Sequence, residues 1–474
     1  MAYTTVGFLA FLMGTAFIYR VCPARLRPAL LAVVSYLYYC LWSLEGALLL
    51  LAVTASSFAA AHAIEAAKNE RRRQAFMFAA LSGLVLLLAA FKLMPFIGEI
   101  LKFSPWVPIG LSYYTFKLIS YVLDVYWGTV TAEKSFVSFA AYAAFFPQIV
   151  AGPIQRSGGF LQQLQQSSPA TAADMAWGLQ RILLGFLKKF LVADILGVPV
   201  DFVYGNLHAT GTPLLLGFYA FPIQLYADFS ALSDIAIGSA AMLGIKSPEN
   251  FSAPFSAPSP SEFWRRWHMT LTSLLTDYVF TPLQMGLRSL GTIGLVISVF
   301  ATMELIGLWH GLRWTYVLFG TVQGCYVAID ALTLRARKRY YKAHPAVQRL
   351  TVWVGPLLTF HLIAASFVLF RAESVADAFY LLGHLGSGIT TQSVAFSALM
   401  AKEFNAIVFA EVAYVVIELV EYLQRRGRGA ALISDMRPWA RWIVYSCATV
   451  TVSSMILLLV GTQVRHVTFV YQMF

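Results

Sequence analysis

Long apolar runs limit the possible folds of this chain more than any other feature of its sequence. The run from Leu290 to Trp309 carries one acidic residue, Glu304, and similar runs recur from the N-terminal to the C-terminal part of the chain. A helix needs about 20 apolar residues to cross the hydrocarbon core of a bilayer. The runs therefore predict an all-α, polytopic membrane protein.

The composition agrees with this class. Hydrophobic residues make up 59% of the chain and charged residues 12%, whereas soluble domains usually carry about 25% charged residues. Counting runs of about 20 residues, we expect roughly eleven transmembrane helices, with amphipathic or re-entrant helices between them. No soluble domain is apparent. We therefore expect one integral-membrane domain over residues 1–474, with N-terminal helices at 1–100, a central core at 105–373 and C-terminal helices at 374–474.

The net charge of +11 does not indicate nucleic-acid binding, because the basic residues gather between the apolar runs. Cytoplasmic loops of membrane proteins carry such an excess of Lys and Arg, so the partner that this pattern predicts is the lipid bilayer. The four cysteines are scattered without metal-binding spacing, and no metal site is expected. The basic clusters are Arg20/Arg25/Arg27, Lys68/Arg71/Arg72/Arg73, Arg335/Arg337/Lys338/Arg339 and Arg425/Arg426/Arg428.

Candidate catalytic residues lie at the end of the run from Leu290 to Trp309. Gly307 and Gly311 are four residues apart, so on a helix they would let another backbone approach closely. His310 and Trp314 have the same spacing and would share a helix face. An imidazole walled by Trp309 and Trp314 suits proton transfer in a secluded site. A histidine that anchors a helix end at the membrane surface fits this stretch equally well.

Several polar residues interrupt other apolar stretches. Lys117 and Asp124 are seven residues apart and would face one side of a helix, where buried charges usually face a bundle interior or a watery cavity. The prolines and glycines of Phe145–Arg156 exclude an uninterrupted helix. Such an unwound segment is tolerated at membrane depth only inside protein or beside a cavity, where Gln148 would point its amide into a pocket. Structural roles or an ordinary loop are the alternatives.

A further apolar stretch, Phe221–Gly238, contains Asp228 and Asp234. Buried carboxylates without bases nearby in the sequence must pair with a cation elsewhere or stay protonated. Their role in a polar interior is more often structural than catalytic. Lys188 and Lys189, which come earlier in the chain, are expected at the cytoplasmic membrane interface.

Ser259 to Glu262 form a capping box with proline at the first helical position. The sequence predicts that one amphipathic helix follows over Phe263–Asp277, too polar to cross the membrane and lying along the interface or inserting partway. His268 falls on its apolar side. We therefore expect this second histidine to face the protein interior.

Three blocks in this order resemble the membrane-bound O-acyltransferase (MBOAT) family. The resemblance is to its bacterial branch, whose members act in alginate O-acetylation and teichoic acid D-alanylation, and it extends over about 105–373. Supporting stretches are Pro108–Phe116, Tyr226–Ser230 and Phe370–Glu373. The three blocks are Phe146-Pro-Gln-Ile-Val-Ala-Gly-Pro-Ile-Gln-Arg156, the stretch Asn250–Pro282 with Phe263-Trp-Arg-Arg-Trp-His268, and Leu308-Trp-His-Gly311.

The resemblance implies a multi-helix bundle around a central tunnel, in a multi-pass protein of the bacterial cytoplasmic (inner) membrane. His310 matches the catalytic histidine of the family, and His268 matches its second histidine. Gln148, Asp228 and Lys117, with Trp309 and Trp314, are weaker candidates for the substrate tunnel. The sequence departs from the family pattern after Pro282-Leu283, where Gly-Gly-Asn-Arg is absent, and Thr276 stands where an arginine is common.

The implied activity is O-acetylation of an extracellular polysaccharide such as alginate or cellulose. The acyl group would come from a cytoplasmic thioester, acetyl-CoA or an acyl carrier protein, with no bound cofactor, and an extracytoplasmic acyltransferase partner would complete the transfer. D-alanylation of teichoic acid and O-acetylation of peptidoglycan are the alternatives within the family. A transporter or flippase would predict internal repeats with paired interrupted helices, yet each histidine block occurs once. A structural scaffold leaves both histidines unexplained.

Overall fold

The computed structural model describes residues 3–102, 106–166, 168–205, 212–387, 394–425 and 436–461. These ranges are built from helices and contain no β-strand. The prediction of an all-α fold is confirmed.

The chain packs as two compact units, Met1–Ile182 with Leu232–Glu249, and Leu183–Ala231 with Asn250–Phe474. Each unit is therefore discontinuous in sequence. The prediction that residues 1–474 act as one domain stays a prediction.

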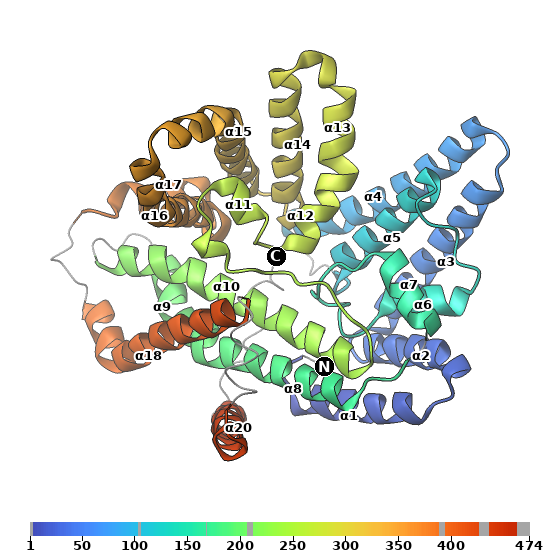
Figure 1. Ribbon diagram of the computed structural model, residues 1–474, viewed down its shortest axis with the longest axis horizontal. Helices are drawn as coiled ribbons and strands as arrows, with labels where there is room; N and C mark the ends of the chain where they lie inside the picture. The colour runs from blue at the N-terminus through green and yellow to red at the C-terminus, as the bar shows by residue number, and fades with distance from the viewer. Residues whose placement is uncertain are drawn as a thin grey trace. The chain divides into compact units, whose positions relative to one another are not determined.

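The first unit holds the N-terminal helices, the start of α8 and the end of α10 (Figure 1). Serine, threonine or asparagine side chains cap several of them; Ser43 Oγ, for example, accepts the Gly46 N–H at 2.9 Å where α3 begins. Such caps supply partners for N–H groups that a helix start leaves without one. The elements are α1 (Val6–Val21), η1 (Ala24–Leu26), α2 (Arg27–Cys40), α3 (Leu44–Ala66), α4 (Glu70–Leu101), α5 (Leu111–Trp127), α6 (Phe136–Ala144), α7 (Ser157–Gln166) and the first part of α8 (Ala172–Leu187).

The second unit holds both candidate histidines. Its helices are interrupted by a π-helical stretch at Lys188–Ala193 and another at Thr276–Phe280. The elements are η2 (Lys188–Ala193), α9 (Asp194–Gly205), the start of α10 (Thr212–Met242), η3 (Pro254–Ser256), α11 (Pro260–Trp264), α12 (Met269–Leu275), η4 (Thr276–Phe280), α13 (Thr281–Gly286), η5 (Arg288–Leu290), α14 (Thr292–His310), α15 (Trp314–Ala343), α16 (Pro345–Arg371), α17 (Val375–His384), α18 (Val394–Arg425) and α20 (Pro438–Gly461).

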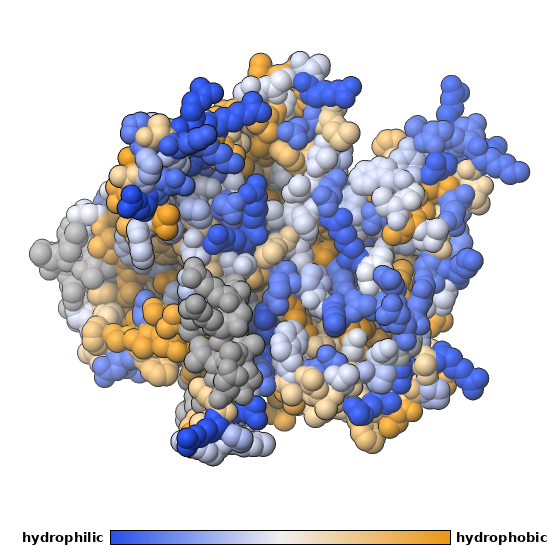
Figure 2. Space-filling model, in the orientation of Figure 1, coloured by the Kyte–Doolittle hydropathy of each residue, from blue (hydrophilic) through white to orange (hydrophobic). Residues whose placement is uncertain are grey.

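Five helices in the described part of the chain are long and apolar enough to cross a membrane. Large apolar side chains also reach the surface in many places, as expected where lipid replaces water (Figure 2). The prediction of a polytopic membrane protein is confirmed, whereas the count of eleven spans and the tunnel stay predictions. Arg426 and Arg428 of the last basic cluster lie outside the described residues. The five spans are Leu44–Ala66, Glu70–Met94, Thr292–His310, Trp314–Ala343 and Pro345–Arg371.

The unwound segment expected in the first unit is present. Residues 145–156 form turns and extended chain between α6 and α7. The Gln148 side chain is buried there, and its amide nitrogen donates to Gln155 Oε1 and to Ser247 Oγ, both at 2.8 Å. The buried irregular backbone thus lies inside protein, as its polar groups require at membrane depth.

In the second unit, α14 and α15 pack closely, and small residues make this possible. A Cβ added at Gly307 would lie 2.3 Å from the Tyr316 carbonyl oxygen, and one added at Gly320 would lie 2.9 Å from the Met303 carbonyl oxygen. Two backbones can approach so closely only where side chains are missing. The close approach expected at Gly307 is confirmed, and it places the C-terminal end of α14 against the first turns of α15.

Candidate functional site

His268 lies at a break between two short helices. The predicted continuous helix over Phe263–Asp277 is wrong: α11 ends at Trp264, α12 begins at Met269, and a π-helical turn follows at Thr276. His268 adopts φ 43° and ψ 53°, the left-handed conformation that a side chain with a Cβ rarely takes. Such a conformation persists only where surrounding contacts fix it.

Asn250 supplies those contacts. The Met269 N–H donates to the Asn250 carbonyl oxygen at 2.9 Å. The Asn250 Oδ1 accepts from the Thr270 hydroxyl at 2.8 Å and from the Thr270 N–H at 3.3 Å, and it lies 3.1 Å from His268 Nδ1. These contacts replace hydrogen bonds that an uninterrupted helix would make, and this is the physical reason for the break.

The same contacts select the His268 tautomer. The atom that faces the Thr270 N–H must be an acceptor, so the amide oxygen of Asn250 points to His268. His268 Nδ1 is therefore the protonated nitrogen, and Nε2 keeps its lone pair. The ring is 1% exposed and lies outside the five candidate spans. Burial lowers the pKa of His268 to about 3, so the imidazole is neutral at physiological pH.

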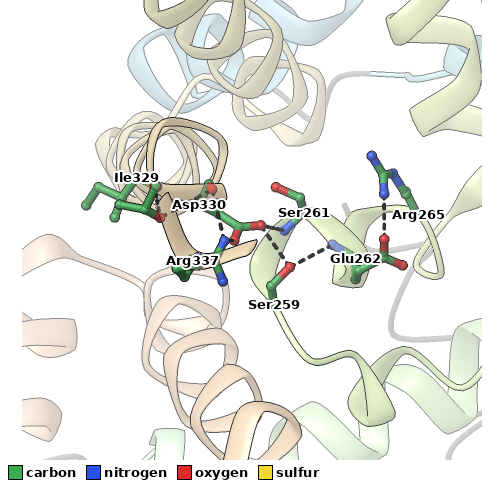
Figure 3. A network of polar contacts seen from close by, with 8 residues as sticks. Ser259, Ser261, Glu262, Arg265, Ile329, Asp330 and Arg337 are labelled. Atoms are coloured by element: carbon green, nitrogen blue, oxygen red, sulfur yellow. Dashed lines mark hydrogen bonds and ion pairs between the residues drawn. The ribbon is translucent and has the colours of Figure 1, made fainter. Parts of the chain in front are cut away.

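The helix before this break is anchored by a carboxylate of α15 (Figure 3). Asp330 Oδ2 accepts the Ser259 hydroxyl at 2.8 Å and the Ser261 N–H at 3.2 Å, and its other oxygen pairs with Arg337. Ser259 in turn accepts the Glu262 N–H at 3.5 Å, so the predicted cap is present. The start of α11 is thus held on α15, a few residues before His268.

His310 is the last residue of α14 and is half-buried. Its ring centroid lies 4.7 Å from Phe370, edge to face, and 6.2 Å from Tyr316. The expectation that Trp314 shares a helix face with His310 is wrong, because α14 ends at His310 and α15 begins at Trp314. Gly311 and the two residues after it interrupt the helix, and the Trp314 side chain is 77% exposed.

Trp309 brings the two histidines into one group of rings. Its centroid lies 5.9 Å from His268 and 4.6 Å from His310, and its side chain is buried. Phe229 of α10 also packs edge to face with His268, with the ring centroids 4.8 Å apart. Residues 42 positions apart, on α14 and at the start of α12, thus share one aromatic cluster. The structure groups His268, Trp309 and His310 and leaves Trp314 apart.

Asp228 belongs to a buried ion-pair cluster. Its carboxylate lies 2.7 Å from Lys189 Nζ, which also pairs with Asp194 at 2.8 Å, and Lys188 pairs with Glu421. Both lysine side chains are buried in the protein, and the expectation that they lie at the level of the cytoplasmic membrane interface stays a prediction. Buried charges require such partners, and the cation that pairs with Asp228 is Lys189 of η2, which is distant in sequence. Asp228 therefore pairs inside the protein, next to Phe229.

The other two weaker candidates lie in the first unit. Lys117 is buried; its ammonium group donates to the Tyr142 carbonyl oxygen and lies 4.4 Å from the Tyr142 ring centroid. Gln148 holds the unwound segment through Gln155 and Ser247. Both side chains thus make structural contacts with their own unit.

Sequence reasoning did not single out three residues that build the site. Asn250 sets the conformation of His268, Phe229 packs on its ring, and Phe370 packs on His310. Asn250 opens one of the three blocks that carry the family resemblance, and Phe370 opens one of the supporting stretches. Their position in those blocks was the available signal, although no rule of spacing connects them with the histidines.

The chain was compared with known proteins. Residues 131–365 match the sequence model described as the MBOAT, membrane-bound O-acyltransferase family. A protein named probable alginate O-acetylase AlgI, from Pseudomonas aeruginosa, is 35% identical over 372 residues, 76% of this chain and 69% of that protein. Peptidoglycan O-acetyltransferase of Helicobacter pylori is 25% identical over 80% of this chain and 77% of its own. Teichoic acid D-alanyltransferase of Bacillus subtilis is 29% identical over 56% of this chain and 69% of its own.

Proposed function

Because the chain belongs to the membrane-bound O-acyltransferase family, we propose that it transfers an acetyl group to a hydroxyl group of an extracellular polysaccharide. The protein is an acyltransferase and a multi-pass protein of the bacterial cytoplasmic membrane, as its sequence predicted. Five proteins named probable alginate O-acetylase, each 32–35% identical, support acetyl as the group and alginate as the polymer.

The observation that carries the proposed mechanism is the aromatic cluster of His268, Trp309 and His310. Acyl transfer from a thioester to a hydroxyl needs a base beside that hydroxyl. His310 is half-buried at a helix end, so a substrate can reach it, whereas His268 is 1% exposed. We assign His310 as the catalytic base and His268 as a positioning residue.

The reaction follows from these assignments. The neutral imidazole of His310 takes the proton of the acceptor hydroxyl while the oxygen attacks the thioester carbonyl carbon. The tetrahedral intermediate collapses, the carbon–sulfur bond breaks, and the thiolate leaves. The His310 imidazolium returns its proton to that sulfur, so the base is regenerated. His268 keeps Trp309 in place, and Trp309 in turn fixes the His310 ring.

The donor in this proposal is a cytoplasmic acetyl thioester, acetyl-CoA or an acetylated carrier protein, and the chain itself holds no cofactor. The acceptor hydroxyl in this step is that of the polymer itself or that of an extracytoplasmic partner protein, which then completes the transfer to the polymer. The loop after Pro282 lacks the Gly-Gly-Asn-Arg of the family pattern, so the segment expected near the donor differs from that pattern.

A single substitution tests the role of His310. In cells that secrete the polysaccharide, His310→Ala should reduce its ester-linked acetate at least 100-fold, because general-base catalysis contributes about 10²–10⁴-fold. The measurement is acetate released by mild alkali per mass of polymer, with the protein level checked by immunoblotting.

His344→Ala is the matched control. His344 directly follows the last residue of α15, but it is exposed and stacks on Tyr340 of that helix. Its substitution should leave the acetate content unchanged. Normal acetate in the His310→Ala strain at normal protein level would refute the assignment, and D-alanine in place of acetate on the polymer would show that the acyl group is wrong.

A further inference from the structure

The C-terminal end of α15 carries four basic side chains on one face of the helix, and all four are exposed. They occupy positions i, i+3, i+4 and i+7, which share one face of an α-helix. Like charges at this spacing repel one another and weaken the helix, and the chain has no acidic residue between Asp330 and Glu373 to offset them. An anion from outside the chain would relieve this repulsion. We call this set the basic stripe: Arg335, Lys338, Arg339 and Lys342.

The other cation of this segment, Arg337, is paired inside the protein. It lies on the opposite face of α15 and pairs with Asp330, whose carboxylate also accepts hydrogen bonds at the start of α11, from Ser259 and Ser261 (Figure 3). None of the four stripe residues forms an ion pair within the described ranges. The stripe thus keeps its positive charge, while the cation on the other face is neutralised.

The basic stripe begins at the level of the lipid headgroups. The part of α15 from Trp314 to Leu334 measures about 30 Å at about 1.5 Å per residue, which is the thickness of the hydrocarbon core, and Arg335 directly follows it. Trp353 of α16 is 81% exposed and lies as far in sequence from the connecting residue His344 as Arg335 does. Because α15 and α16 pack together with this single residue between them, the two side chains lie at a similar depth. Exposed tryptophans favour the membrane interface, and basic ends of this kind face the cytoplasm.

Exposed apolar side chains continue the same face of α15 into the membrane. Leu332 is 45% exposed and precedes Arg335 by three residues, and Ile329, which is 60% exposed, precedes Leu332 by three. One continuous face therefore changes from apolar to basic at the level where a phospholipid changes from acyl chain to phosphate. A soluble acidic protein could meet the charges, but it would not reach the apolar part, which lies in the hydrocarbon core.

We propose that the basic stripe and the apolar residues before it bind an anionic phospholipid of the cytoplasmic leaflet. The guanidinium groups of Arg335 and Arg339 hold the lipid phosphate through charge-assisted hydrogen bonds, and the two lysines add electrostatic attraction. One acyl chain lies along Leu332 and Ile329. The bound lipid stabilises the end of α15 whose Asp330 carboxylate holds the start of α11. Binding requires no acyl transfer, so the site is independent of the proposed function.

The test measures lipid binding to the purified full-length protein in detergent. The probes are phosphatidylglycerol, which is anionic, and phosphatidylcholine, which is zwitterionic, with identical acyl chains, and native mass spectrometry of a lipid titration gives the Kd of each. Wild type should bind phosphatidylglycerol at least tenfold more tightly than phosphatidylcholine. In Arg335→Gln with Arg339→Gln the Kd for phosphatidylglycerol should rise at least tenfold, because each basic residue near an anionic lipid contributes roughly fivefold in affinity. The Kd for phosphatidylcholine should stay unchanged.

Three further variants separate the basic stripe from its surroundings. Arg335→Lys with Arg339→Lys keeps the charge and should recover most of the affinity. Arg71→Gln with Arg72→Gln removes two exposed arginines from the start of α4, where adjacent positions do not share a helix face, and should leave the Kd near wild type. Leu332→Gln keeps all four charges of the stripe and should weaken phosphatidylglycerol binding through the loss of the acyl-chain contact.

A second readout follows stability. A ligand that binds only the folded state raises the unfolding midpoint, so phosphatidylglycerol should raise the midpoint of wild type more than that of Arg335→Gln with Arg339→Gln. Equal binding of the two lipids by wild type, or an equal loss of binding in Arg71→Gln with Arg72→Gln, would overturn the site. So would binding of soluble glycerol phosphate as tight as that of the lipid, because it would assign the stripe to a free phosphate. Loss of an acidic carrier protein in the stripe variant, with phosphatidylglycerol binding retained, would also overturn it.

Discussion

The two histidines differ in what their surroundings allow. His310 is half-buried at the end of α14, whereas His268 is enclosed: its Nδ1 donates to Asn250, and its ring contacts Phe229 and Trp309. A base must reach the proton that it abstracts. The greater exposure of His310 therefore identifies it as the proposed catalytic base and His268 as the positioning residue. The sequence alone does not distinguish them, because each block contains one histidine.

Burial of His268 predicts a dependence of stability on pH. Its pKa is about 3 in the folded protein, against about 6.5 for an unfolded chain, so the unfolded state binds the extra proton between these values. Stability is then full above pH 6.5 and falls as the pH drops below it. At pH 5 the loss is about 2 kcal/mol relative to pH 7.

His268→Gln removes the titrating group and keeps a polar side chain. Thermal unfolding in detergent at pH 7 and pH 5 should show a smaller decrease in the midpoint for the variant than for wild type. The difference between the wild-type decrease and the variant decrease isolates the contribution of His268, because the other groups that titrate between pH 5 and pH 7 contribute equally to both proteins. Equal decreases would contradict a neutral, buried imidazole.

At the scale of the helices, the sequence predicted apolar spans and the unwound segment at 145–156, but not the break at His268. Apolar runs and the glycine spacing indicated α14, α15 and their close packing. The break at His268 depends on Asn250, and the pairing of Asp228 depends on Lys189, 39 residues earlier. Helical periodicity describes contacts within a helix, whereas these contacts join different elements, so no pattern in the local sequence could reveal them.

The close approach of α14 and α15 can be tested at Gly307. In Gly307→Ala the new methyl group would meet the Tyr316 carbonyl oxygen at 2.3 Å, so the helices must separate. We expect a loss of about 1–3 kcal/mol in stability, typical of overpacking, and reduced acetyl transfer because His310 lies one turn further along α14. Thermal unfolding in detergent measures the loss of stability.

Gly83→Ala is the control for this substitution. Gly83 lies inside α4, and no atom lies within 4 Å of the position its Cβ would take. Alanine there should leave the midpoint unchanged or raise it, because glycine weakens a helix interior by about 0.5–1 kcal/mol. If both variants unfold at the wild-type temperature, the glycine contact does not set the packing of α14 on α15.

At the scale of the whole molecule, the fold class and the family followed from the sequence, and the comparisons confirmed both. The composition and the apolar runs indicated an all-α membrane protein, because helices that cross a bilayer need long apolar stretches. The ordered blocks indicated the family. The grouping of His268 with His310 through Trp309 required coordinates, since it depends on how α12 packs near the end of α14.

The central claim is that His310 performs acyl transfer in this chain. The most direct measurement uses the purified protein in lipid vesicles, with a radiolabelled acetyl thioester supplied on the cytoplasmic side and a soluble oligosaccharide acceptor on the other. Wild type and His344→Ala should form the labelled acetyl ester at similar rates, and His310→Ala should form it at least 100-fold more slowly. Ester formation by His310→Ala at the wild-type rate would contradict the claim.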